Sequence, residues 1–121
     1  MELTEFVAAL DRLTADDIRL VAKSLENETF SDEVDWWRAT IAIDRAIRHA
    51  RVARHAARAA ARAAQIVQER AEQGGVMLPD DDVTRVARAA AEIARGLSVG
   101  PATQPIVVLL MEPWAAVVPI V

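Results

Sequence analysis

Apolar positions with a helical period begin at the start of the chain. Five of them, spaced by three or four residues, fall on one face of a short helix: Leu3, Phe6, Val7, Leu10 and Leu13. Thr14 and Asp17 then have the spacing of a capping box, in which each side chain accepts a hydrogen bond from the other residue's amide. A second short helix is expected from there to the polar run 26–29, and it forms a hairpin with the first.

The stretch from Ser31 to Gln73 has neither proline nor glycine and is rich in alanine and arginine, which predicts one long helix capped by Ser31 or Asp32. At about 1.5 Å per residue it would be roughly 60 Å long, whereas a compact chain of this size has a radius of gyration of only about 14 Å. The other helices are therefore expected to pack along it, unless it protrudes and meets a partner.

Small residues form a heptad stripe along this helix. Counting in sevens from Trp36, the stripe beyond Ile43 is almost entirely alanine: Ala46, Ala50, Ala53, Ala57, Ala60, Ala64, Val67 and Ala71. Alanine allows a neighbouring helix to approach closely, but it also has the highest helix propensity, so the run is either a packing seam or a rigid rod. Ala57 and Ala60 lie on this seam, and Ala59 lies off it.

Gly74 and Gly75 have the character of a helix C-cap, and Pro79 followed by three aspartates begins another helix. That helix is expected to run to about Arg95 and to return antiparallel onto the long helix. Its apolar stripe consists of Val83, Val86, Ala87, Ala90, Ala94 and Leu97.

An apolar tail follows Gly100 and Pro101. Residues 106–111 are uncharged and rich in β-branched side chains, so an extended strap packed across the helices is expected. Prolines and Glu112 interrupt the tail, which argues against a membrane span of about twenty unbroken apolar residues. The predicted fold is therefore an all-α, irregular antiparallel bundle. Two short N-terminal helices and one C-terminal helix pack along one long helix in a single domain, residues 1–100, and residues 101–121 form the tail.

Two segments resemble a family of small uncharacterised actinobacterial all-helical proteins. They are Asp35-Trp36-Trp37-Arg38-Ala39-Thr40-Ile41 and Asp82-Val83-Thr84-Arg85-Val86-Ala87-Arg88. The similarity covers about residues 1–100. It implies a helical fold and no particular activity, and it transfers no functional residue.

Charge is segregated along the chain, whose net charge is −4. Residues 1–35 carry ten acids against three basic residues, and residues 45–68 carry six arginines and no acid. The simplest expectation is that the arginines pair with the N-terminal acids inside the protein. The alternative is an anion-binding line for nucleic acid, less favoured because no aromatic residue lies between Arg38 and Glu112 to stack on a base. That line consists of Arg48, Arg51, Arg54, Arg58 and Arg62.

No motif for catalysis, cofactor binding or metal binding in the sequence rises above a chance match. His49 and His55 are six residues apart, a poor spacing for two ligands on one helix, and the Asp80–Asp82 run is explained by helix capping. There is no cysteine, and no serine has glycine at an adjacent position. The chain also begins without the pattern of a secretory signal. A non-enzymatic, cytoplasmic protein without cofactor is therefore expected.

Protein contacts are the function that this sequence favours. Trp36 and Trp37 point about 100° apart on a helix, so only one can enter the core, and Trp37 is the candidate for a partner surface. The long helix and the apolar tail both need covering, which predicts a homodimer. The expected partner-binding residues are Trp37, Ile106, Val107, Leu109 and Trp114.

Overall fold

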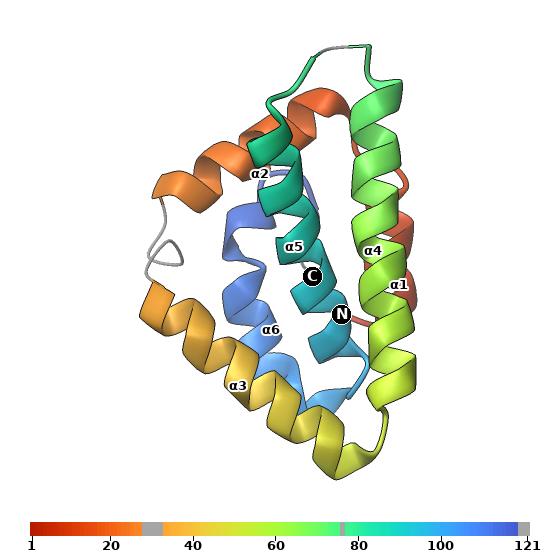
Figure 1. Ribbon diagram of the computed structural model, residues 1–121, viewed down its shortest axis with the longest axis vertical. Helices are drawn as coiled ribbons and strands as arrows, with labels where there is room; N and C mark the ends of the chain where they lie inside the picture. Colours follow the sequence, from red (N-terminus) through yellow and green to blue (C-terminus); the bar gives the residue numbers. More distant parts are fainter. Residues whose placement is uncertain (28–32, 76, 119–121) are drawn as a thin grey trace.

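The computed structural model of the chain describes residues 1–27, 33–75 and 77–118, and within these ranges its regular elements are all helices. They are α1 (Leu3–Leu10), α2 (Ala15–Asn27), α3 (Glu33–Ala50), α4 (Ala53–Gln73), α5 (Asp80–Leu97), η2 (Pro101–Thr103), α6 (Gln104–Leu110) and η3 (Glu112–Trp114). Helices α2, α3 and α4 outline a triangle, with α5 and α6 inside it (Figure 1). The predicted all-α bundle is confirmed.

Helix α2 begins where the sequence predicts, but α1 and α2 do not form the expected hairpin, because α1 packs on α4 and α5 whereas α2 packs on α5, α4 and η3. The Thr14 amide donates to Asp17 Oδ2 at 3.0 Å, and the Asp17 amide donates to Thr14 Oγ1 at 3.1 Å, so both bonds of the capping box are present. Phe6, Leu10 and Ile18 are fully buried. The local signal therefore fixes where α2 begins.

The single long helix predicted for residues 31–73 is wrong at its centre. Helix α3 ends at Ala50, and α4 begins at Ala53 after a sharp corner (Figure 1). Arg51 adopts a left-handed φ of 59°. The Val52 amide donates to the Ile47 carbonyl at 3.2 Å and the Arg51 amide to the Arg48 carbonyl at 3.3 Å, which are the two bonds of a Schellman motif. Because this motif usually has glycine where the chain has Arg51, the sequence gives no sign of it.

We expect Arg51→Gly to stabilise the protein by about 0.5–1 kcal/mol. The left-handed conformation costs an ordinary residue roughly 1–2 kcal/mol that glycine avoids, and glycine's larger entropy in the unfolded chain offsets part of the gain. Urea denaturation measures the difference. Ala61→Gly, at an exposed interior position of α4, is the control and should destabilise by about 1 kcal/mol. Equal losses for both variants would contradict the break at Arg51.

Helix α4 packs closely on α5, but only the last members of the predicted seam, Val67 and Ala71, are buried there. Ala57 is exposed, whereas Ala59, expected to lie off the seam, is buried. The break at 51–52 resets the helical phase, so a heptad counted from Trp36 does not describe the first half of α4. The face that α4 buries consists of Ala56, Ala59, Ala63, Ile66, Val67 and Ala71.

Ala63→Leu is expected to destabilise the protein by about 1–3 kcal/mol, because Ala63 is fully buried and three extra carbons overpack its contact. Ala57→Leu, on the exposed side of the same helix, should change the free energy of unfolding by less than about 0.5 kcal/mol. Thermal unfolding of the two variants checks this pair. Equal tolerance at both sites would show that α4 does not pack through the Ala63 face.

The tail is helical rather than extended, which corrects the expected strap. Prolines occupy the first turn of η2, α6 and η3, where their missing amide and fixed φ favour helix initiation. The Thr103 hydroxyl donates to the Gly96 carbonyl and fastens the tail to α5. A Cβ on Gly96 would lie only 2.5 Å from Val107 Cγ2, so the absence of a side chain there lets α6 approach α5.

Trp114, at the end of η3, lies in the middle of the core. It is fully buried and meets Phe6 of α1 edge to face, with ring centroids 6.0 Å apart and planes at 71°. Val107, Leu110, Met111 and Val118 are also buried. One side of the tail is therefore covered within the chain, over residues 107–118.

Candidate interaction surface

The outer face of α3 presents a large aromatic side chain to solvent. Trp37 is 65% exposed, and Ile41, one turn further along, is 39% exposed. The opposite face of the helix buries Ala39, Ile43 and Ile47. Two apolar side chains thus sit together on a helix face that the described chain leaves uncovered, and Ile41 is a member that sequence reasoning missed.

The tail residues expected to bind a partner divide into two groups. Leu109 is 47% exposed beside Val108, and Ile106 is partly buried. Val107 and Trp114 are 1% and 0% exposed, so naming them as partner-binding residues was wrong for the folded chain. A run of apolar residues does not itself say which side faces inward, because that depends on where the tail packs.

The arginine line is exposed but bent. Arg48 and Arg51 belong to the corner where α3 ends, and Arg54, Arg58 and Arg62 recur every four residues on the outer side of α4. None of these five arginines forms an ion pair with a carboxylate that the structure describes, so the expected pairing with the N-terminal acids is not found there.

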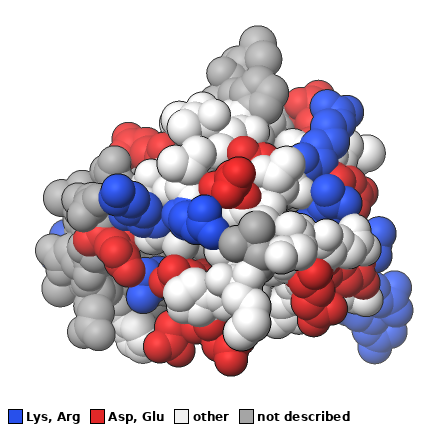
Figure 2. All heavy atoms as spheres, turned by 90° about the horizontal axis from the view of Figure 1, so that it is seen from above, with Lys and Arg blue, Asp and Glu red and all other residues white. Residues whose placement is uncertain are grey.

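The other end of the molecule mixes the two signs of charge. Seen from above, where α4 turns into α5, acidic and basic side chains alternate over the surface (Figure 2). The corner between α3 and α4 lies at the far end of the molecule (Figure 1). The five arginines of the line, none with a described ion pair, therefore lie at that corner and along the first half of α4.

A charged cluster joins α3 to α5 beside this corner. The Arg95 Nη1 donates to both carboxylate oxygens of Glu92 at 2.9 Å, and its Nη2 donates to Asp44. The Glu92 side chain is only 10% exposed. Burial raises the pKa of Glu92, an effect strengthened by Asp44 and opposed by the hydrogen bond and charge of Arg95 and by the charge of Arg88. Glu92 lies on the buried side of α5 together with Ala89 and Ile93. A charged residue within this buried stripe is a signal in the sequence that could have identified the cluster.

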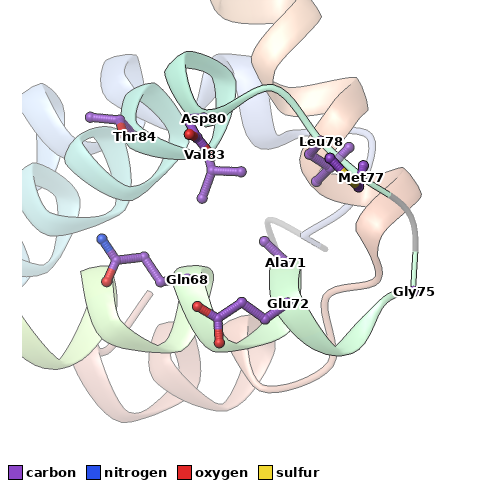
Figure 3. Close-up of a pocket in the computed structure, with 9 residues that line it drawn as sticks. All are labelled: Gln68, Ala71, Glu72, Gly75, Met77, Leu78, Asp80, Val83 and Thr84. Atoms are coloured by element: carbon purple, nitrogen blue, oxygen red, sulfur yellow. The ribbon is translucent and has the colours of Figure 1, made fainter.

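The surface has two open hollows, one beside the charged cluster and one at the turn between α4 and α5. One, of about 500 Å³, lies between α3, α4 and α5, and its polar rim is formed by Asp44, Arg48 and Arg95. The other, of about 610 Å³, lies where α4 turns into α5 and is lined by apolar residues together with Gln68, Glu72, Asp80 and Thr84 (Figure 3). Neither rim pairs a nucleophile with a base. Within the described residues there is also no group of three side chains suited to a metal ion.

Glu92→Gln should change how stability depends on pH. Because the pKa of Glu92 is raised in the folded chain, the stability contributed by its neutral form is complete below the unfolded pKa and is lost as pH rises through the folded pKa. Glutamine removes this loss and still accepts a hydrogen bond from Arg95. The free energy of unfolding of the variant, relative to the unchanged protein, should therefore rise between about pH 4 and pH 7. A constant or falling difference in urea titrations would contradict it.

Comparison with family models, curated proteins and solved structures finds no match for this chain. The similarity to small actinobacterial helical proteins therefore stays a prediction. No described helix is both long and apolar enough to cross a membrane.

Proposed function

We propose that this protein is a non-enzymatic helical interaction module that binds a partner protein on the outer face of α3. The observation that carries the proposal is Trp37, which is 65% exposed on a helix whose other face is anchored in the core. An exposed tryptophan loses favourable burial, and this residue type is enriched where partners bind. As part of the same proposal, the module has no cofactor and acts in the cytoplasm.

The charge around the patch indicates the chemistry of the partner. Ile41 has Trp37 and Arg38 one turn before it and Arg45 one turn after it, and both arginines are exposed. Neither arginine is ion-paired with a described residue. The matching surface presents one or two apolar side chains with carboxylates at their rim, because arginines at an interface edge favour acidic partners.

An amphipathic peptide with a leucine face and a glutamate rim is a direct probe, with the lysine-rimmed peptide as its counterpart. We expect the glutamate peptide alone to bind, shifting the Trp37 indole resonance, and Trp37→Ala to weaken binding at least about tenfold. Leu109→Ala, exposed on α6, is the matched control and should leave the affinity unchanged. Equal binding of both peptides, or no effect of Trp37→Ala, would overturn the proposal.

A second candidate function is supported by one observation, the exposure of Arg54, Arg58 and Arg62 on one side of α4. Three phosphates could lie along these guanidinium groups, which would make the module a nucleic-acid binder. Affinity for an oligonucleotide should then fall steeply with salt and be lost in Arg58→Glu/Arg62→Glu, while Trp37→Ala has no effect. Binding that does not respond to these arginines would exclude it.

A further inference from the structure

The outer face of α4 carries an ordered series of charges. Five exposed residues spaced by four, three, four and three lie along one line of the helix: Arg58, Arg62, Gln65, Glu69 and Glu72. This line lies opposite the face that buries Ala56, Ala59 and Ala63. The line is basic in its first part, neutral at Gln65 and acidic in its last part.

This order is unfavourable within one chain. Arg58 and Arg62 are like charges four residues apart, and Glu69 and Glu72 are like charges three apart, so each pair repels by a few tenths of a kcal/mol. Basic residues near the start of a helix and acidic residues near its end also oppose the helix dipole. The fold therefore does not explain the order.

Within the described residues, no side chain of opposite charge pairs with the four charged residues of this line. Arg62 and Glu69 are seven residues apart, about 10 Å along the helix, too far for a direct pair. None of the four charged side chains forms an ion pair with a described residue, and the one described contact is Gln65 Nε2 donating to Glu69 at 3.0 Å. Glu72 lies at the edge of the line that is nearer α5, where its side chain also lines the larger hollow (Figure 3).

We propose that the occupant of this face is α4 of a second copy of the chain, packed antiparallel about a two-fold axis at Gln65. In that register Arg58 meets Glu72 of the second copy, and Arg62 meets its Glu69. The axis repeats both pairs, so four charge pairs form. Antiparallel helices also bring opposite dipole ends together. Ala61, exposed between Arg58 and Gln65, lets the two backbones approach.

The pairing uses a different helix from the partner face of α3, so it goes beyond the proposed function. The expected homodimer was based on one long helix and an uncovered tail, and neither is found, because α3 and α4 are separate helices and Val107 and Trp114 of the tail are buried. One helix pair overlapping by about 17 residues, or roughly 25 Å, gives a contact at the small end of specific interfaces. The dimer is accordingly weak and sensitive to salt.

Sedimentation of charge-reversed variants tests the pairing. At about 50 mM salt the protein should dimerise, and at about 500 mM it should be a monomer. Arg58→Glu/Arg62→Glu and Glu69→Arg/Glu72→Arg should each weaken the dimer at least about tenfold. The variant with all four changes, which exchanges the two ends of the line, should recover the dimer, and a mixture of the two double variants should form a heterodimer. Arg38→Glu on α3 is the control and should have no effect.

Distances between the two copies test the register. The chain has no cysteine, so a single introduced cysteine carries one spin label per copy. Labels at Gln65→Cys should lie about 10 Å apart and labels at His55→Cys about 30 Å apart, whereas a parallel dimer would give similar short distances at both. A single-chain mass at about 200 μM in low salt would overturn the proposal. So would failure of the fourfold variant to recover the dimer. Either result would leave the peptide test of α3 unaffected.

Discussion

Trp114→Ala is expected to destabilise the protein by about 3–5 kcal/mol, a large share of the stability of a domain this size. The indole is fully buried, and its edge-to-face contact with Phe6 joins η3 to the first helix. Alanine would leave a cavity among α1, α2 and the tail that a close-packed core fills only in part. Urea denaturation measures the loss, and a loss below about 1 kcal/mol would show that Trp114 is not in the core.

Trp114→Phe separates packing from hydrogen bonding. The buried Trp114 Nε1 has no hydrogen-bond acceptor in the described structure, and leaving such a donor unsatisfied costs about 1–3 kcal/mol. Phenylalanine loses volume but removes the unsatisfied donor, so its cost should be clearly smaller than that of alanine. Leu109→Ala, 47% exposed on α6, is the control and should cost less than about 1 kcal/mol.

Signals that act within a few residues were enough to predict much of the fold. The capping box at Thr14 and the apolar stripe of α5 are set by local hydrogen bonding and helical spacing, and both are present in the structure. Gly74 follows the last residue of α4 as predicted. Composition alone separated an all-α chain from one with a sheet, since alanine and arginine dominate its centre.

The features that the sequence did not predict depend on longer-range packing. Arg51 adopts a conformation usually taken by glycine, and alanine on both sides of it favours a continuous helix. The prolines of the tail were interpreted as interruptions, although Pro105 and Pro113 each lie in the first turn of a short helix. Pro119 lies outside the described residues. For the candidate surface, the 100° between Trp36 and Trp37 predicted the exposure of Trp37 correctly. No local spacing, however, indicated that Trp114 would pack on Phe6.

Arg95→Met is expected to destabilise the protein by about 2–3 kcal/mol. It removes the only ion-pair partner that the described structure gives Glu92, whose carboxylate is 10% exposed, and it also frees Asp44, which is 42% exposed. Losing one member of a buried pair costs more than the pair itself contributes, because the remaining charge stays poorly hydrated. The estimate lies below the usual range for buried pairs since the Arg95 side chain keeps 25% exposure. Urea denaturation at neutral pH measures it.

The double variant Arg95→Met/Glu92→Met should lie closer to the unchanged protein than Arg95→Met does. Removing both charges leaves two apolar side chains at a helix contact, and Asp44 is exposed enough to be hydrated on its own. Arg19→Met breaks an exposed pair with Asp16, and as the control it should shift the free energy of unfolding by less than about 0.5 kcal/mol. If the double variant were as unstable as Arg95→Met, the cost would come from the packing of the arginine chain and not from the charge left on Glu92.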